Sequence, residues 1–354
     1  GPWTAQVLDT VTCPSFDITS SRVSPTVAIC WLKMAEEGVV GNYDVWYQYS
    51  NDMGAYFVTQ AKENITRYAA DEPGYRAWLE LSCLYDTNDD LHIIWSASPY
   101  NGDRQPCTSR SCRLFHWVQT TDIISTVHNA EWDPLLNCGA GGPNVLNIGK
   151  FSISECNDRL YVIWVQYGDP ENGDTSDCAD INLAGIGNRA NGEIYMTCSS
   201  SIWGTLWDRP HNLTNTKTPN CDSTSGNECG NENWPTMSRF GMDNLDFSGL
   251  DWDEASEAFT VDPSEYPPYY GTTYLDVMYV NDVVPGPSQV VMGDSGTFNY
   301  NDPIKWFRLP CINPHLWVKP NYYPKEITYP EYTAHGVSKD YKIIPWLFTK
   351  KGYY

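Results

Sequence analysis

The feature that most constrains the fold is a pair of adjacent apolar strands that recurs along the chain. Residues 79–99 read LELSCLYDTNDDLHIIWSASP, and residues 151–169 read FSISECNDRLYVIWVQYGD. In each, an apolar run ending near a cysteine (Cys83 or Cys156) leads through a polar turn into a second run that reaches Ile-Trp. Such short runs, rich in Tyr, Val, Ile and Trp and bounded by Gly, Asn, Asp and Pro, indicate strands. Helical periodicity is nearly absent, so the sequence predicts an all-β protein.

Two looser copies extend the repeat. Residues 234–244 (WPTMSRFGMDN) precede YLDVMYVND at 274–282, and residues 24–32 (SPTVAICWL) precede YDVWYQYS at 43–50. Repeated strand pairs of this kind form the centres of four-stranded blades that pack radially around an axis. We therefore expect a β-propeller of four-stranded blades, five or six in number, with long disulfide-clipped loops.

Composition divides the chain into two parts. The propeller is expected over residues 1–311, with the two ends of this range as candidates to complete one closing blade. Residues 312–354 form an irregular tail rich in Pro, Tyr and Lys. A basic, aromatic tail on an acidic body could dock on its own propeller or on a neighbouring subunit.

The charge excludes some partners. The chain has 22 Lys and Arg residues against 44 Asp and Glu residues, a net charge of −22 that repels phosphate backbones, so we expect no nucleic acid as partner. The longest wholly apolar run, Val27 to Leu32, is far shorter than the roughly 20 residues of a membrane-spanning helix. No signal-peptide core is present, so the sequence is interpreted as a mature chain without a transmembrane segment.

Twelve cysteines in this loop-rich chain favour a disulfide framework in an oxidising compartment, hence a secreted or cell-surface protein. No CxxC or CxxH spacing suggests zinc. Three pairings are expected: two local loop clips and one bond fastening the ends of the propeller, namely Cys107–Cys112, Cys221–Cys229 and Cys13–Cys311. The sequons at Asn64 and Asn212 permit N-glycans.

One short motif resembles a known family. Residues 50–57 (SNDMGAYF) fit the pattern S-x-D-x-G-x-x-[WF] through Ser50, Asp52, Gly54 and Phe57. A degenerate copy has Ser200, Gly204 and Trp207, with Ile202 in place of the aspartate. The pattern resembles the Asp-box of the sialidase-like (BNR-repeat) secreted bacterial β-propellers, over roughly residues 22–310. The resemblance implies a structural role for both boxes, on outer hairpins away from the axial pocket.

The resemblance also raises the question of catalysis. Sialidases are similar in fold but carry an arginine triad, a Tyr–Glu pair and an Asp acid/base on the axis, and an F-R-I-P motif near the start. Here Phe307 to Pro310 read FRLP near the end, where Arg308 is interpreted as a structural strand residue. No nucleophile elbow, Walker loop or HExxH motif is present, and the sequence assigns no catalytic residue.

Two further groups of residues are candidates for binding. Acidic loops could hold Ca²⁺ through hard oxygen ligands, although solvated turns explain them as well; the candidates are Asp86, Asn88, Asp90, Asp169, Asp174 and Asp177. A long insertion rich in Trp, Tyr and acid could stack on a sugar ring or cover a propeller face; its candidates are Trp252, Asp253, Glu254 and Tyr266.

The sequence therefore supports three functional hypotheses. The favoured one is a secreted or cell-surface non-catalytic propeller that acts as a structural, assembly, or glycan- or protein-binding component. The first alternative is a sialidase-like glycoside hydrolase with an axial active site. The second is a calcium-dependent adhesin. No other cofactor is expected.

Overall fold

The computed structural model describes these parts of the chain: residues 5–11, 15–36, 39, 41–57, 62–69, 71–102, 111–132, 138, 146–168, 178, 189–216, 218–221, 229–243, 250–253, 258–261, 273–282, 304–311 and 325–327. Every regular element in these ranges is a β-strand, which confirms the all-β expectation. Within the same ranges, no helix is long and apolar enough to cross a membrane.

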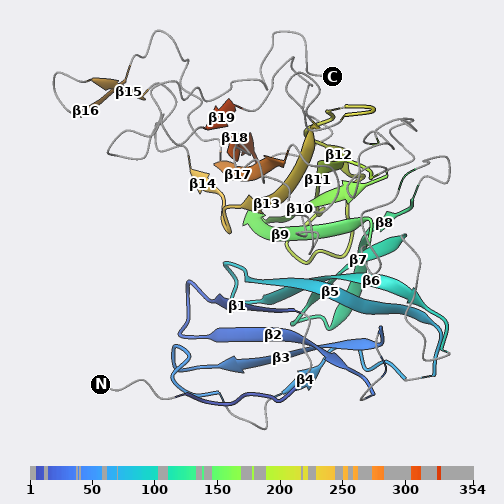
Figure 1. The fold of residues 1–354 in the computed structure, drawn as a ribbon. Coiled ribbons are helices and arrows are strands. Elements are labelled where there is room, and N and C mark those ends of the chain that lie inside the picture. The colour runs from blue at the N-terminus through green and yellow to red at the C-terminus, as the bar shows by residue number, and fades with distance from the viewer. Residues whose placement is uncertain are drawn as a thin grey trace.

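Most strands fall into four consecutive antiparallel sets, which we call strand groups 1 to 4 (Figure 1). Groups 1 and 2 are joined into one eight-stranded sheet through the pairing of Tyr43 with Ala77. Group 1 contains β1 (Phe16–Ser20), β2 (Val27–Met34), β3 (Tyr43–Ser50) and β4 (Glu63–Asn64). Group 2 contains β5 (Gly74–Tyr85), β6 (Leu91–Tyr100), β7 (Cys112–Val118) and β8 (Ile123–Ala130). Group 3 contains β9 (Ile148–Cys156), β10 (Arg159–Tyr167), β11 (Gly192–Cys198) and β12 (His211–Asn212). Group 4 contains β13 (Asn231–Met237), β17 (Thr273–Asp282), β18 (Ile304–Pro310) and β19 (Lys325–Ile327).

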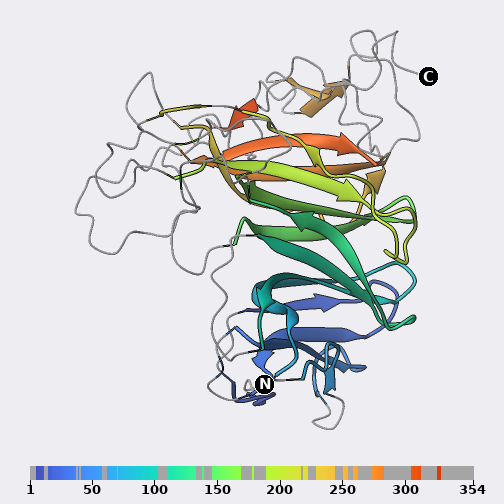
Figure 2. The same ribbon diagram turned by 90° about the vertical axis from the view of Figure 1, so that its right-hand side faces the viewer.

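Three short strands lie beside this plan. Strand β14 (Met242–Asp243) pairs with β17, and β15 (Leu250–Asp253) forms a separate hairpin with β16 (Ala258–Val261). The first strands of successive groups contact one another, β1 with β5, β5 with β9 and β9 with β13. The groups thus follow one another through the molecule from the N-terminal group onward (Figure 2). This is a propeller-like arrangement in which the first strand of each group is the innermost.

Three of the four strand pairs found in the sequence are the first and second strands of a group: β5 with β6, β9 with β10, and β13 with β17. The fourth pair is displaced by one strand, since residues 24–32 and 43–50 fall on β2 and β3. The sequence missed β1, the innermost strand of group 1. It has only five residues and its apolar side chains, Phe16 and Ile18, are exposed, so it lacks a buried run.

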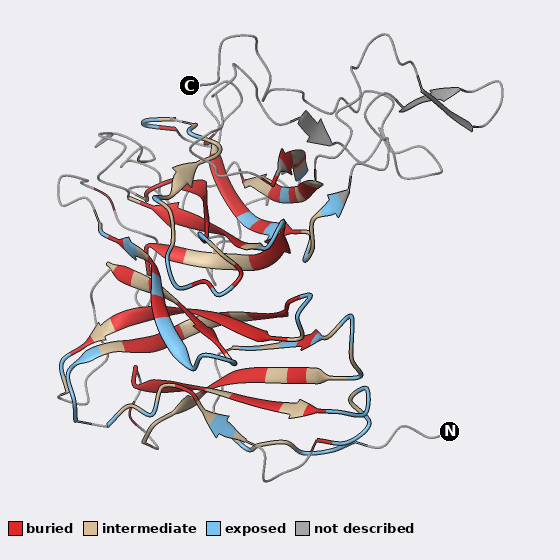
Figure 3. Cartoon of the chain, turned by 180° about the vertical axis from the view of Figure 1, so that it is seen from behind, coloured by how far each residue is buried: buried red, intermediate tan, exposed pale blue. Residues whose placement is uncertain are grey.

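Buried residues are found in the strands of all four groups (Figure 3). One cluster of buried side chains joins groups 1, 2 and 3 around Trp95 and Trp164, both fully buried. A second joins groups 3 and 4 around Tyr161, Leu275 and Val277. The strand groups therefore share their core with their neighbours, as stacked sheets do.

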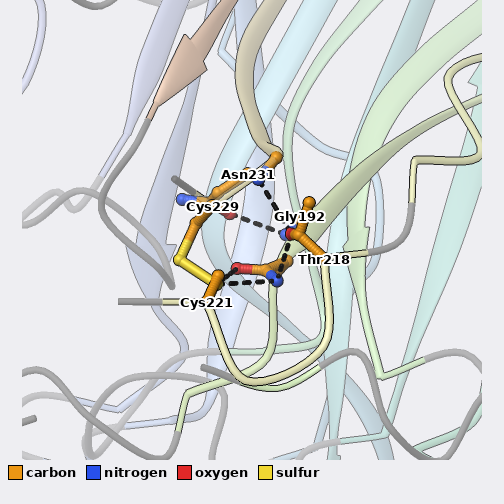
Figure 4. Close-up of a disulfide and its surroundings, with 7 residues drawn as sticks. Gly192, Thr218, Cys221, Cys229 and Asn231 are labelled. Atoms are coloured by element: carbon orange, nitrogen blue, oxygen red, sulfur yellow. Dashed lines mark hydrogen bonds between the residues drawn. A yellow bond between two sulfur atoms is a disulfide. The ribbon is translucent and has the colours of Figure 1, made fainter. Parts of the chain in front are cut away.

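The disulfides differ in part from those expected. Cys221 and Cys229 are bonded beside the start of β13, where the Gly192 N–H donates to Asn231 Oδ1 at 2.6 Å (Figure 4). Gly192 has no space for a side chain, because a Cβ atom there would lie 2.7 Å from the carbonyl oxygen of Glu232. This close approach holds β11 against β13. Another disulfide joins Cys138 to Cys178.

Two predicted pairings are wrong. Cys311 is bonded to Cys156 and not to Cys13, because the end of β18 lies beside the β9–β10 turn, where Asn157 Nδ2 donates to the Cys311 carbonyl at 3.2 Å. Cys112 is a free thiol and not the partner of Cys107. It opens strand β7 with its side chain buried in the core, so it does not belong to the preceding loop. Cys13 and Cys107 themselves lie outside the described residues.

Candidate axial site

Three neighbouring innermost strands share one irregularity. In β5, β9 and β13, the pairing register with the second strand shifts, which marks a β-bulge. Each bulge holds one non-glycine residue with a positive φ: Leu79 (61°), Lys150 (54°) and Trp234 (55°). Bulky residues rarely adopt this conformation, which costs about 1–3 kcal/mol and tends to occur at functional sites. The coincidence of three such residues on adjacent strands directs attention to this level of the axis.

The bulges bring side chains of different groups together. The backbone N–H of Lys150 donates to the Glu80 carboxylate, and Lys150 Nζ lies 3.4 Å from Glu80 Oε1. The same ammonium lies 4.1 Å from the centroid of the Trp234 ring, a cation–π contact. A carboxylate from group 2, a cation from group 3 and an indole from group 4 therefore form one connected row. All three are accessible to solvent: Glu80 and Lys150 are partly exposed, and Trp234 is 45% exposed.

Group 1 adds a second carboxylate. Asp17 Oδ2 accepts hydrogen bonds from Ser82 Oγ at 3.0 Å and from the Cys83 N–H at 2.8 Å, so β1 is attached to β5. Ser82 follows Glu80 by two residues on β5, so Asp17 is attached to this strand next to the bulge that carries Glu80.

Arg239, just after β13, completes the arrangement. Its guanidinium lies 3.6 Å from Asp17 Oδ1 and donates to the carbonyls of Cys83 at 2.5 Å and Ile18 at 3.4 Å. It thus connects group 4 with groups 1 and 2. We call the following set the axial cluster: Asp17, Glu80, Ser82, Lys150, Trp234 and Arg239. It offers two carboxylates, each beside a cation, and one exposed aromatic face.

The residues of the first Asp-box lie far out in group 1, in the connection between β3 and β4. Ser50 Oγ accepts the Gly54 N–H at 3.2 Å and donates to Asp52 Oδ1 at 2.5 Å. Asp52 also accepts the Tyr56 N–H at 2.9 Å, and the Ser50 hydroxyl and this N–H lower the pKa of its carboxyl. Phe57 is buried. These bonds hold the hairpin together, and none of them involves the axial cluster.

The degenerate box occupies the same place in group 3, between β11 and β12. Ile202, at the aspartate position, is buried, and the Trp207 indole N–H donates to the Gly204 carbonyl at 2.8 Å and to Ser125 Oγ at 3.1 Å in group 2. Ser200 donates its N–H to the Leu206 carbonyl. The lost aspartate is thus replaced by packing and by the bonds of Trp207 against the neighbouring group.

The calcium candidates in the first loop are engaged in its turn. Asp86 Oδ1 accepts the N–H groups of Asn88 at 2.9 Å and Asp90 at 2.7 Å, and Asp90 Oδ1 accepts the Thr120 N–H at 2.9 Å. In the part of the chain that the structure describes, no three His, Cys, Asp or Glu side chains are grouped to hold a metal ion. The candidates of the second loop, Asp169, Asp174 and Asp177, lie outside the described residues.

The remaining candidates lie elsewhere. Trp252 and Asp253 belong to β15, of which only the backbone is described, and Glu254 and Tyr266 lie outside the described residues. Arg308, in the third strand of group 4, forms a two-point ion pair with Asp276 at 2.7 and 3.0 Å. It therefore has a structural partner within its own group.

The sequence did not identify the axial cluster. In the sequence, Glu80 and Lys150 lie shortly before the two repeat cysteines, Cys83 and Cys156. Arg239 lies within the looser copy of the repeat at residues 234–244. Nothing in the sequence showed that bulges would bring these residues to one level. β1, which carries Asp17, was not found as a strand.

Comparison with known proteins gives structural likeness alone. No family model matches the chain, and no curated protein matches it in sequence. A thermostable family-43 glycoside hydrolase resembles it with a TM-score of 0.36 and 8% identity, over 90% of this chain and 73% of that one. An α-L-arabinofuranosidase from Fusarium graminearum does so with a TM-score of 0.40 and 10% identity, over 84% and 62%. A Bombyx mori family-32 β-fructofuranosidase follows with 0.35 and 11%, over 77% and 44%.

These findings correct the favoured functional hypothesis. The sequence predicted a non-catalytic structural or binding component, whereas the structural neighbours named above are all glycoside hydrolases. That hypothesis is not retained. At TM-scores of 0.40 and below, the likeness does not identify a reaction for this chain, so the chemistry must be argued from the axial cluster itself.

Proposed function

We propose that the chain is a glycoside hydrolase whose active site is the axial cluster. The observation that carries the proposal is that two carboxylates of adjacent innermost strands each lie beside a cation: Asp17, bonded to Ser82 two residues from Glu80, lies beside Arg239, and Glu80 lies beside Lys150. The exposed Trp234 contacts Lys150. Most glycoside hydrolases use two carboxyl groups that flank the scissile bond, one as acid and one as base or nucleophile. An exposed indole is a suitable platform for the apolar face of a sugar ring.

The contacts suggest different roles for the two carboxyl groups. Asp17 is held by the Ser82 hydroxyl, the Cys83 N–H and Arg239, which fix its orientation as a base or nucleophile requires. Glu80 is bonded on one side by Lys150 and is partly open to solvent, where it can reach a leaving-group oxygen as the acid. Lys150 is a positioning residue between Glu80 and Trp234.

The proposal differs from the sialidase type. A sialidase needs several arginines that converge on a carboxylate of the substrate. Arg308 forms an ion pair with Asp276, and the Arg76 guanidinium donates to the backbone carbonyls of Ala69 and Glu72 in the segment before β5. Of these three arginines, Arg239 is the one that contacts an axial carboxylate. A glycosidase that uses Arg239 and Lys150 to orient its own carboxyl groups fits the axial cluster better.

Several expectations from the sequence accompany this proposal. The four strand groups would be blades of a closed propeller of five or six blades, and the Asp-box would relate the chain to the BNR-repeat propellers. The three disulfides among the described residues support a secreted or cell-surface location. A glycan would be the partner at the axis. The tail from residue 312 onward remains a candidate contact with a neighbouring subunit.

A panel of aryl glycosides tests the function. We expect wild-type protein to hydrolyse at least one of them, and Asp17→Asn and Glu80→Gln each to lower kcat about 100-fold or more with a small change in KM. Asp71→Asn, an exposed carboxylate in the loop before β5, is the matched control and should retain wild-type turnover. Thermal unfolding monitored by circular dichroism verifies that each variant is folded. Wild-type activity in both axial variants would reject the proposed site, and no turnover of any glycoside by the wild type would reject the proposed function.

A further inference from the structure

Two free cysteines meet at the boundary between groups 1 and 2. Cys30 lies on β2 and Cys83 on β5, and both side chains are completely buried in the same core cluster. Strands β2 and β5 are in contact there, and the Cys30 thiol lies close enough to Cys83 to raise the pKa of its thiol. Asp17 contacts both cysteines. It is the cross-strand partner of Cys30, whose thiol donates to the Asp17 carbonyl at 3.6 Å, and its carboxylate accepts the Cys83 N–H.

A disulfide between neighbouring strand groups is already present between groups 3 and 4. Cys83 and Cys156 occupy the same place in the two clearest sequence repeats, near the end of the first strand of groups 2 and 3. Cys156 is joined to Cys311, which follows the third strand of group 4, so this disulfide links two neighbouring groups. Cys83 also faces a cysteine of a neighbouring group.

The surroundings determine when a bond could form. Burial is the main cause, and the adjacent Cys30 thiol the second, that raises the pKa of the Cys83 thiol well above its usual range. The reactive thiolate is therefore scarce in the folded protein. No solvent reaches either sulfur atom. Oxidation therefore belongs to folding, before groups 1 and 2 pack together, and the buried bond would then resist reduction.

We propose that Cys30 and Cys83 form a disulfide that joins β2 to β5 when the chain folds in the presence of a small-molecule disulfide. In the first step, the thiolate of one cysteine attacks oxidised glutathione, giving a mixed disulfide and one glutathione thiolate. In the second step, the other cysteine displaces the second glutathione. The protein loses two protons and two electrons, and both electrons are taken up by the glutathione disulfide as it becomes two thiols. Both cysteines contact Asp17, but the existence of the bond does not depend on the proposed hydrolase activity.

Peptide mapping without reduction tests this proposal on wild-type protein. Trypsin releases Cys30 in residues 23–33 and Cys83 in residues 77–104, and each fragment contains a single cysteine. The chain is refolded with oxidised and reduced glutathione, its free thiols are alkylated in denaturant, and the digest is analysed by mass spectrometry. We expect most of both fragments to appear as one cross-linked species that reduction separates.

Two controls make the outcome decisive. The Cys156–Cys311 fragment must be cross-linked in the same digest, which shows that oxidation was complete. Cys30→Ala should leave Cys83 fully alkylated, whereas Cys198→Ala, which removes a different buried free thiol, should not change the Cys30–Cys83 species. Recovery of both fragments with alkylated thiols, while Cys156 and Cys311 are cross-linked, would overturn the proposal.

Discussion

At the scale of single residues, the two sequons are a structural motif of the outermost strands. Asn64-Ile65-Thr66 and Asn212-Leu213-Thr214 follow the two Asp-boxes at β4 and β12. Each threonine hydroxyl donates to a buried carboxylate of the third strand, Asp44 or Glu193, at 2.7 or 2.8 Å, and accepts the next backbone N–H along that strand. Each asparagine caps the turn that follows. The same residues thus make the same bonds in groups 1 and 3.

Removing either hydroxyl should destabilise the protein. Thr66→Val and Thr214→Val each leave a buried carboxylate without one donor and a buried N–H without its acceptor, and so each should lower the free energy of unfolding by roughly 1–3 kcal/mol. Urea unfolding of protein made without glycosylation measures this. Thr120→Val, at an exposed threonine, is the control. Equal midpoints for all three variants would show that the motif has no structural role.

A second residue-scale feature is a buried pair of histidines between β6 and β7. His92 Nδ1 lies 3.0 Å from His116 Nε2, and His92 Nε2 lies 3.4 Å from Asp86. Burial, and then the charge of His92, hold the pKa of His116 well below its usual range. The position also explains Gly204, because a Cβ atom there would lie 2.3 Å from the His116 ring.

The contribution of His116 to the free energy of unfolding should fall as the pH falls below about 6.5, where the His116 imidazole is protonated in the unfolded chain. In the folded chain this imidazole is protonated only at a lower pH. Between these two pH values the unfolded state binds one more proton than the folded state, so the free energy of unfolding falls by roughly 1 kcal/mol per pH unit. Burial raises the pKa of Glu155, which acts in the opposite direction above pH 4.5. The measurement is therefore the difference between wild type and His116→Gln in urea midpoints from pH 7.5 to 5.5. If the urea midpoints of the two proteins changed in parallel with pH, His116 would not be the group responsible for the loss of stability.

At the scale of the element, the strands could be predicted from the sequence but the bulges could not. Short runs of apolar and aromatic residues, bounded by turn residues, marked β5, β6, β9, β10, β13 and β17. A bulge depends on the register of the partner strand, which no local pattern contains. Without it, Glu80, Lys150 and Trp234 looked like unrelated polar and aromatic positions. This is the physical reason why the candidate site was missed while its supporting strands were found.

At position 150, the backbone conformation favours glycine, whereas the proposed activity needs the lysine ammonium. Lys150→Gly and Lys150→Met both remove the ammonium beside Glu80, but only glycine relieves the positive φ of 54°. We expect the glycine variant to be about 1 kcal/mol more stable than the methionine variant in urea unfolding. Both should lose activity to a similar degree. A glycine variant that is less stable than the methionine variant would mean that the left-handed backbone at this position carries no strain.

At the scale of the whole molecule, the disulfides link parts of the chain that are distant in sequence. Local spacing was sufficient to propose Cys221–Cys229, whose cysteines are 8 residues apart. It could not identify Cys156 as the partner of Cys311, 155 residues away, because that pairing depends on which strand group follows which in space. The assumption that the two ends of residues 1–311 meet led to the wrong partner, Cys13.

The long-range bond should contribute more to stability. Chain entropy assigns about 5 kcal/mol to closing a loop of 155 residues and about 2–3 kcal/mol to one of 8 residues. The double variant Cys156→Ala/Cys311→Ala should therefore lose about twice as much free energy of unfolding as Cys221→Ala/Cys229→Ala, by urea unfolding under oxidising conditions. Equal losses would mean that groups 3 and 4 are held together without the bond.

The central claim is that a sugar binds at the axis between Asp17, Glu80 and Trp234. The most direct measurement is a crystal structure of the Glu80→Gln protein soaked with the glycoside that the wild type hydrolyses best. The account predicts a sugar ring stacked on Trp234, with its glycosidic oxygen within hydrogen-bonding distance of residue 80 and its anomeric carbon facing Asp17. A sugar bound only at another surface, with the axial cluster unchanged, would contradict it.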